Sequence, residues 1–157
     1  MESNLRKNII AIIFNDDLDV LIWKYNSSKP SWTLPKWWIN DDETEVEWLF
    51  REIKEELNIP KDNLTIVHEY EKNFIKYFTQ EEIDWKIKNK WEHFIWKSEK
   101  PFIIKFSWDP NIIDVKITNE LSEFKFVKIN DLGQYLAMPL IDFLDLDYMR
   151  KIINDSK

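Results

Sequence analysis

Three glutamates within one short stretch offer the clearest chemistry in the chain. Glu52, Glu55 and Glu56 stand at positions i, i+3 and i+4 of the segment Arg51–Glu56. On a helix, residues at these spacings share one face, so the three carboxylates would crowd together. Like charges repel, and a divalent cation that prefers oxygen ligands would compensate them. The alternative is a solvated acidic helix face, which is the usual fate of a run of charges.

The helix that must carry these carboxylates is predicted over Glu45–Leu57. Thr44, followed three residues later by Glu47, is a capping-box pattern at its start. Asn58 tolerates the left-handed conformation that ends a helix, and Pro60 blocks its continuation. One buried apolar stripe at helical spacing is predicted from Val46, Leu49, Phe50, Ile53 and Leu57.

The rest of the chain predicts a single mixed α+β domain over residues 1–157. β-branched and aromatic runs indicate strands at Asn8–Phe14, Val20–Tyr25, Leu64–Tyr70, Phe74–Thr79, Phe102–Ser107 and Glu123–Val127. The first two are expected to form a hairpin across Asn15-Asp16-Asp17. Loops are predicted at Lys36–Glu43 and Asp84–Glu92, the second with an irregular hairpin as the alternative. Helices are predicted at Asn130–Leu136 and Ile141–Ile153.

Composition narrows the class of protein. Hydrophobic residues make up 44% of the chain, which argues against disorder, and no apolar run is long enough to cross a bilayer. The absence of cysteine excludes disulfides and thiolate metal sites, so we expect a cytoplasmic protein with no membrane partner. A net charge of −7 disfavours broad binding to a nucleic-acid backbone. Composition leaves the oligomeric state open.

The segment from Trp37 to Ile59 resembles the Nudix box, G-x5-E-x7-R-E-U-x-E-E-x-G-U, where U is aliphatic. The residues in register are Glu43, Arg51, Glu52, Ile53, Glu55, Glu56 and Ile59. Only the two glycine positions differ, and they hold Trp37 and Asn58. The preceding Trp32–Lys36 is similar to the W-x-L-P-K that leads into the box in many family members.

This resemblance implies a Nudix α/β/α sandwich with a mixed β-sheet and hydrolysis of a phosphoanhydride bond in a nucleoside diphosphate derivative. The implied ligands of Mg²⁺, with Mn²⁺ as the alternative, are Glu52, Glu55, Glu56 and the backbone carbonyl of Lys36. Glu52 is alternatively the group that polarises the attacking water. Glu43 and Arg51 would hold the loop to the helix. Metal ions neutralise a diphosphate and activate water, so this acidic set suits the reaction.

A weaker resemblance concerns the substrate. Trp96–Phe102 is similar to the G-Q-K-Q-K-W-F of bacterial RNA 5′-pyrophosphohydrolases and dinucleoside polyphosphate hydrolases, although only Lys100 and Phe102 match. It implies that Lys36, Lys97 and Lys100 contact phosphates, with solvated surface lysines as the alternative. Glu123 would complete the metal site, as the glutamate of a P-E-F does in that branch; an exposed strand-end residue is the alternative. The aromatic residues Tyr70, Phe74, Tyr77 and Phe78 suit either base stacking or the core.

Tryptophan is abnormally frequent and glycine abnormally rare. The chain has nine Trp and one Gly, whereas average usage of roughly 7% would give about eleven glycines. Trp37 and Trp38 stand where the family favours Gly, Trp48 where it favours a small residue, and Trp23, Trp96 and Trp108 where small turn residues would be natural. We therefore hypothesise that most of these tryptophans are glycines encoded by UGA. The alternative is a Trp-rich variant with a remodelled loop.

Two classes of function follow. The first is a hydrolase that acts on a nucleotide substrate, either a dinucleoside polyphosphate or the 5′-triphosphate end of RNA. Within this class, nucleoside triphosphates and nucleotide sugars are the alternative substrates. The second class is a non-catalytic nucleotide-binding module with the same fold, which literal tryptophans at 37 and 38 would favour.

Overall fold

A computed structural model describes residues 5–28, 30–39, 44–90, 94–107, 110–118 and 120–156. The strands are β1 Leu5–Phe14, β2 Val20–Tyr25, β3 Trp32–Thr33, β4 Lys36–Trp38, β5 Leu64–Glu69, β6 Phe74–Tyr77, β7 Trp96–Phe106 and β8 Leu121–Val127. The α-helices are α1 Glu45–Leu57, α2 Gln80–Lys90, α3 Met138–Leu144 and α4 Leu146–Asp155. Short 3-10 helices are η1 Lys61–Asn63, η2 Pro110–Ile112 and η3 Ile129–Gln134.

One mixed eight-stranded sheet organises these elements. Its main path is β3-β2-β1-β7-β5, while β4 pairs with β1, β6 with β7 and β8 with β2. The long strands β1 and β7 run parallel, and the other pairs are antiparallel. The predicted hairpin between β1 and β2 is confirmed, with Phe14 opposite Val20. No helix within the described ranges is both long and apolar enough to span a bilayer.

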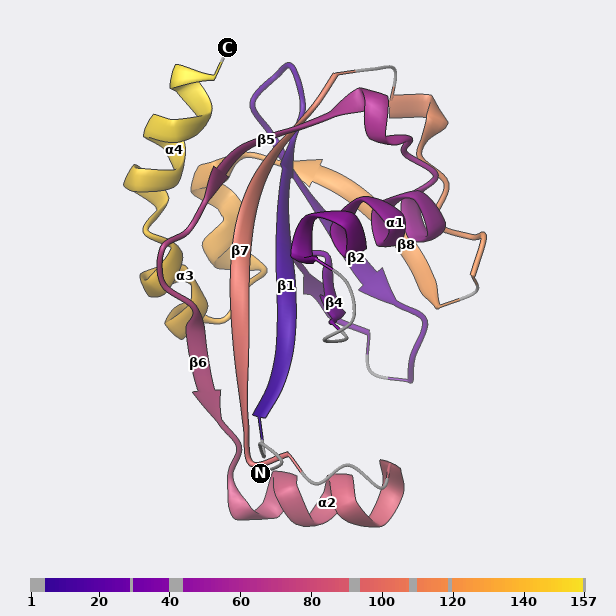
Figure 1. The fold of residues 1–157 in the computed structure, drawn as a ribbon, viewed down its shortest axis with the longest axis vertical. Helices are drawn as coiled ribbons and strands as arrows, with labels where there is room; N and C mark the ends of the chain where they lie inside the picture. Colours follow the sequence, from indigo (N-terminus) through magenta and orange to yellow (C-terminus); the bar gives the residue numbers. More distant parts are fainter. Residues whose placement is uncertain are drawn as a thin grey trace.

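Both faces of the sheet are covered, which explains the unbroken apolar run of β1. Side chains alternate along a strand, so Ile9, Ala11 and Ile13 pack on the α1 side, and Ile10 and Ile12 on the other. The second face is covered by η3, α3 and α4. Figure 1 shows this layering, with α1 in front of the sheet. The α+β class and the predicted sandwich are therefore confirmed.

Helix α1 has the predicted bounds and ends. The Thr44 hydroxyl accepts a hydrogen bond from the Glu47 amide at 3.2 Å. Asn58 adopts the left-handed conformation, with φ of 61°. The predicted stripe is correct for the buried Leu49, Ile53 and Leu57, whereas Val46 is exposed.

Several predicted segments differ from the structure. Gln80–Lys90 is a helix, so the loop predicted at Asp84–Glu92 is wrong over Asp84–Lys90. The loop predicted at Lys36–Glu43 begins with the short strand β4. The single residue Asp145, with φ of 57°, separates the two C-terminal helices within the predicted Ile141–Ile153 helix. Trp23 and Trp96 lie in strands rather than turns, and Trp108 lies outside the described residues.

Candidate functional site

The acidic face of α1 is partly withdrawn from solvent. Glu56 is 8% exposed, and its carboxylate accepts a hydrogen bond from the Thr118 hydroxyl at 2.9 Å. The side chain of Glu52 is 16% exposed, while that of Glu55 is largely exposed. The helix therefore presents two sheltered carboxylates and a third at the solvent boundary.

Burial and mutual repulsion change the acidity of this face. Burial, followed by the charges of Glu55 and Glu56, raises the pKa of Glu52 to about 7. Burial also raises the pKa of Glu56, and the neighbouring carboxylate of Glu120 raises it further. Too little positive charge lies near these carboxylates to keep all of them ionised. Such a set of oxygen donors fits a hard divalent cation, which would supply the missing charge.

Glu120 was not among the residues predicted for the site. Its charge raises the pKa of Glu52, Glu56 and Tyr25, which places it beside the acidic face. Glu123, which the sequence favoured, instead lies opposite Lys24 in the β2–β8 ladder, with 3.9 Å between the Lys24 Nζ and its carboxylate. Only the register of β8 against β2 distinguishes these two glutamates, and the sequence pattern does not contain it.

Arg51 lies along the acidic face. Its guanidinium is 3.8 Å from the carboxylate of Glu52 and 3.9 Å from that of Glu55. It also lies 4.3 Å from the ring centre of Trp48, one turn before Glu52. Glu43 falls outside the described residues, so its predicted bond to Arg51 stays a prediction.

Tyr25 connects the acidic face to β4. Its hydroxyl donates a 3.4 Å hydrogen bond to the carbonyl of Lys36, the carbonyl predicted as a metal ligand. Burial raises the pKa of Tyr25 to about 12, and the charge of Glu56 adds to this rise. The Lys36 carbonyl and the Glu56 carboxylate therefore both lie near one tyrosine.

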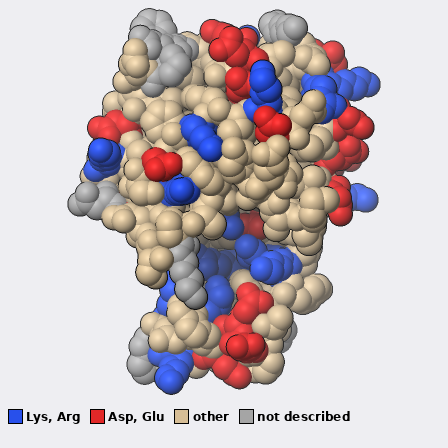
Figure 2. Space-filling view, turned by 180° about the vertical axis from the view of Figure 1, so that it is seen from behind, with Lys and Arg blue, Asp and Glu red and all other residues tan. Residues whose placement is uncertain are grey.

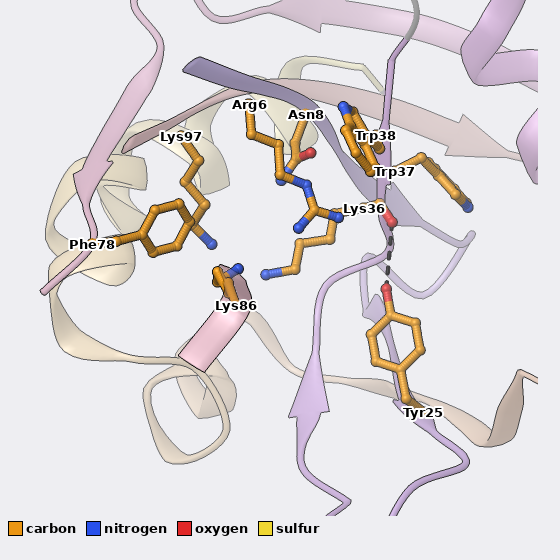
Figure 3. A pocket seen from close by; sticks show the side chains of 9 residues that line it. All are labelled: Arg6, Asn8, Tyr25, Lys36, Trp37, Trp38, Phe78, Lys86 and Lys97. Atoms are coloured by element: carbon orange, nitrogen blue, oxygen red, sulfur yellow. Dashed lines mark hydrogen bonds between the residues drawn. The ribbon is translucent and has the colours of Figure 1, made fainter. Parts of the chain in front are cut away.

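A basic pocket of about 220 Å³ lies next to this junction. It is lined by Arg6, Asn8, Tyr25, Lys36, Trp37, Trp38, Phe78, Lys86 and Lys97. Figure 3 shows the amino groups of Lys36, Lys86 and Lys97 and the guanidinium of Arg6 converging on one space. This volume is below the roughly 300–1,000 Å³ of a drug-sized ligand site, so the pocket suits part of a nucleotide.

A buried carboxylate balances part of this charge. Glu99 is 2% exposed and lies 3.4 Å from the Lys97 Nζ and 3.8 Å from the Lys36 Nζ. It also accepts a 3.3 Å hydrogen bond from the Asn8 amide. Burial, followed by the charge of Lys36, lowers the pKa of Lys97 to about 8. An anionic ligand would favour the protonated form of this lysine.

The three predicted phosphate contacts are not all together. Lys36 and Lys97 line the basic pocket. Lys100 instead lies 2.6 Å from the carboxylate of Glu69 and 3.9 Å from that of Glu45. Because side chains alternate along β7, Lys97 and Lys100 belong to opposite faces of the strand.

The predicted metal ligands fit a cation by their chemistry. Within the described ranges, no three acidic or histidine side chains are already close enough to enclose an ion. Glu52 and Glu56 nevertheless supply sheltered oxygens whose raised pKa reflects burial and unbalanced negative charge. Carboxylate and carbonyl oxygens are the donors that Mg²⁺ uses in proteins.

Tryptophans fill space around both halves of the site. Trp23, Trp37 and Trp48 are buried, and the indole N–H groups of Trp37 and Trp48 have no hydrogen-bond partner in the described structure. The rings of Trp23 and Trp37 meet edge to face at 5.3 Å. Positive φ among the non-glycine residues described occurs only at Leu18, Asn58 and Asp145. These tryptophans therefore adopt ordinary backbone conformations. What is unfavourable about Trp37 and Trp48 is a buried, unpaired N–H group and a large side chain.

Comparison with known proteins adds sequence evidence. The family described as NUDIX domain matches residues 4–145. A Pseudomonas putida protein named RNA pyrophosphohydrolase is 31% identical over 58 residues, which are 37% of this chain and 36% of that protein. The match thus spans about a third of that relative's length. A protein of the same name from a Nitratiruptor species is 27% identical over 141 residues, 87% of this chain and 86% of that protein.

Solved structures share the fold. A crystal structure of a C. elegans Ap4A hydrolase binary complex superposes with a TM-score of 0.59 and 21% identity. The superposition covers 95% of this chain and 93% of that one. At this level of identity the likeness establishes the architecture alone.

Proposed function

The chain belongs to the NUDIX domain family, and we propose that it is a metal-dependent pyrophosphohydrolase acting on a nucleotide that carries a polyphosphate. One observation carries the proposal: the acidic face of α1 and the basic pocket adjoin at Tyr25 and Lys36. A phosphoanhydride substrate needs both, because a cation held by carboxylates and fixed basic side chains each offset phosphate charge.

The metal would be held by Glu55, Glu56, the Lys36 carbonyl and either Glu120 or Glu123, with Glu52 as a further ligand unless it serves as the base. Bound Mg²⁺, or Mn²⁺ in its place, neutralises the phosphates and lowers the pKa of water. The protein's part is to position these oxygens. Arg51 holds the carboxylates of Glu52 and Glu55, and Tyr25 holds the Lys36 carbonyl.

Glu52 is the best candidate for the group that receives a proton. Where Glu52 is not itself a metal ligand, its sheltered, ionised carboxylate beside the metal site would accept a proton from the attacking water. The water oxygen bonds to phosphorus, its proton passes to Glu52, and the bridging P–O bond breaks. Lys36 and Lys97, from strands β4 and β7, would bind the phosphate chain. Lys100 lies on the α1 side of the sheet, opposite the face that carries Lys97, and would bind phosphate only if the chain extended along that side.

Two substrates are the first candidates: the 5′-triphosphate end of RNA and a dinucleoside polyphosphate. The relatives named RNA pyrophosphohydrolase support the first. The C. elegans neighbour, an Ap4A hydrolase, motivates testing the second. Nucleoside triphosphates and nucleotide sugars are the alternatives.

The test is a panel of these four substrate classes with Mg²⁺, on the unaltered protein and on Glu56→Gln. We expect metal-dependent release of a phosphate product, and a loss of about a hundredfold or more in Glu56→Gln. Glu47→Gln is the matched control, because Glu47 lies on the same helix with its side chain exposed. Turnover that persists without metal, or survives Glu56→Gln, would contradict the proposal.

A non-catalytic nucleotide-binding module is the second candidate function. The observation in its favour is that Trp37 and Trp48 are buried beside the predicted metal ligands. Such a protein would bind a nucleotide in the same assay without turning it over. If turnover appears only after these tryptophans are replaced by glycine, the chain as written is that module.

A further inference from the structure

The segment that precedes β8 lies against the C-terminal half of α1. Ile113 is buried in the same core cluster as Leu57. The Asp114 amide donates a hydrogen bond to the Leu57 carbonyl at 3.0 Å, and the Asn58 side chain donates one to the Ile112 carbonyl at 3.1 Å. Apolar burial and hydrogen bonds thus hold this segment to the helix, so the residues that follow approach the acidic face of α1 from a fixed position.

Thr118, in the last part of this segment, contacts two glutamates of the candidate site at once. Its hydroxyl donates a 2.9 Å hydrogen bond to the carboxylate of Glu56. The same hydroxyl accepts a hydrogen bond from the Glu120 amide at 3.4 Å. Ser and Thr hydroxyls commonly fix a turn by accepting from the amide two residues later. One hydroxyl therefore both orients a carboxylate of α1 and holds the backbone of Glu120.

The backbone of Glu120 is held from its other side as well. Its carbonyl accepts a 2.7 Å hydrogen bond from the Asn26 amide, and β8 begins at the next residue. Burial raises the pKa of Glu56 and the charge of Glu120 raises it further, so the two carboxylates lie near each other. Thr118 is thus the hydrogen-bonded link between the start of β8 and the acidic face of α1.

The donor to Glu56 is neutral, whereas the guanidinium of Arg51 lies against Glu52 and Glu55. The side chain of Lys36 is on the other face of the sheet. Figure 2, the view from behind, shows Lys and Arg side chains gathered in a hollow on that side, away from α1. A hydroxyl orients a carboxylate without cancelling its charge. Glu56 therefore has a defined direction and can still offer its negative charge to a cation.

We propose that Thr118 is a positioning residue for the cation, because its hydroxyl holds Glu56 and Glu120 side by side before the ion binds. This rests on the proposed function and takes Glu120, rather than Glu123, as the glutamate that completes the metal site. Ligands that are already in place bind an ion more tightly than ligands that must be ordered on binding. Removing the hydroxyl would free the Glu56 carboxylate to turn and would leave the Glu120 amide without this acceptor.

The test is the binding of Mn²⁺ to the nucleotide-free protein, followed by the electron paramagnetic resonance signal of free Mn²⁺. We expect Thr118→Val, which keeps the side-chain shape and removes the hydroxyl, to weaken Mn²⁺ binding about tenfold. Thr118→Ser restores a hydroxyl and should bind Mn²⁺ within about twofold of the unaltered protein. Thr65→Val is the matched control, because Thr65 is an exposed threonine of β5, and it should leave Mn²⁺ affinity unchanged.

Equal Mn²⁺ affinity in Thr118→Val and the unaltered protein would overturn the proposal. So would a loss that Thr118→Ser shares, since packing of the side chain and not its hydroxyl would then be responsible. An unaltered protein that binds no Mn²⁺ would overturn it too. Circular dichroism of each variant shows whether the fold is retained.

Turnover of the nucleotide panel is measured separately and distinguishes this proposal from the proposed function. Metal-dependent turnover by the unaltered protein, together with normal Mn²⁺ binding by Thr118→Val, would refute the role of Thr118 and leave the proposed function intact. Mn²⁺ binding that depends on the Thr118 hydroxyl, without turnover of any nucleotide, would refute the hydrolysis and leave the role of Thr118 in holding the cation.

Discussion

At the scale of single residues, the buried tryptophans conflict most with their surroundings. An unpaired buried donor costs about 1–3 kcal/mol, and two such indole N–H groups lie at Trp37 and Trp48. Trp32, by contrast, keeps its ring against Lys24, Lys125 and Tyr135. This contrast supports the hypothesis that positions 37 and 48 belong to glycines encoded by UGA.

Replacing Trp37 by glycine tests this hypothesis. Truncating a natural buried Trp costs about 3–5 kcal/mol. We expect Trp37→Gly instead to keep its free energy of unfolding within about 1 kcal/mol and to raise hydrolysis of the preferred nucleotide, because the ring no longer fills space at the wall of the pocket. Urea denaturation and initial rates measure the two quantities.

Trp32→Gly is the control for this experiment, and it should destabilise the protein without raising activity. A loss of about 3 kcal/mol or more in Trp37→Gly would show that the ring belongs to the natural core. The codons give an independent answer, since UGG at position 37 would end the idea and UGA would support it.

Lys97 gives a prediction about pH. Its pKa of about 8 means that the free protein begins to lose this positive charge just above neutral pH. A bound polyphosphate stabilises the protonated form, so binding at pH 8 should take up a proton, and affinity should fall as pH rises through 8. Calorimetry in buffers of different ionisation enthalpy measures the uptake.

Lys97→Met should abolish most of that uptake, whereas Lys88→Met should not change it. If Lys97→Met takes up as many protons on binding as the unaltered protein, another group is the one that becomes protonated. This measurement also shows whether Lys97 contacts the ligand, because a lysine remote from the phosphates would titrate identically in free and bound protein.

At the scale of elements, local signals predicted α1 and failed for α2. The capping Thr44, the spacing of Leu49 and Ile53 and the left-handed Asn58 all lie within α1 or at its ends and define it. Helix α2 has no buried face, so no apolar periodicity identifies it. Its capping residues Thr79 and Glu82 were the available signal.

The residues of the candidate site also divide into those that the sequence could predict and those that it could not. The carboxylates of α1 could be predicted because helical spacing alone brings them together. Glu120, Arg6 and Lys86 could not, since strand register and the packing of distant segments place them. The position of Lys100 could not be predicted either, because a motif letter does not reveal to which face of β7 a side chain points.

The end of α1 offers a test of its cap. Asn58 holds φ of 61°, and its side chain donates to the Ile112 carbonyl at 3.1 Å. Asn58→Ala should lower the free energy of unfolding by about 1–2 kcal/mol, because alanine disfavours the left-handed region and lacks the amide. Asn58→Gly, which removes only the side-chain bonds, should be less harmful. Urea denaturation distinguishes them, and equal losses would show that the conformation carries no penalty.

At the scale of the whole molecule, the fold separates charges that the overall composition conceals. The net charge is −7, yet the pocket between β1, β4, β7 and α2 is basic, while the carboxylates of α1 are concentrated on one face of that helix. The parallel pair β1 and β7 forms the centre of this arrangement, since it supplies Arg6 and Lys97 from neighbouring strands. The same sheet therefore positions both the acidic face of α1 and the basic pocket. For this reason, ligand binding and the stability of the folded protein should be linked.

That linkage predicts how stability changes with pH. The pKa of Glu52 is raised from 4.5 to about 7, so between these values the folded protein holds a proton that the unfolded chain releases. Stability from this group is therefore full below pH 4.5 and is lost as pH rises to 7. Without metal, we expect Glu52→Gln to raise the melting temperature relative to the unaltered protein at pH 8, and to have a smaller effect at pH 5.

Mg²⁺ should change the pH dependence of stability in the opposite direction. A cation bound by ionised carboxylates stabilises the folded state by mass action, most strongly where Glu52 is deprotonated. Mg²⁺ should therefore raise the melting temperature of the unaltered protein more at pH 8 than at pH 5, and should have little effect on Glu56→Gln. Glu47→Gln, outside the acidic face, should respond as the unaltered protein does. An equal Mg²⁺ response in all three proteins would place the cation elsewhere and remove the support that α1 gives to the proposed hydrolysis.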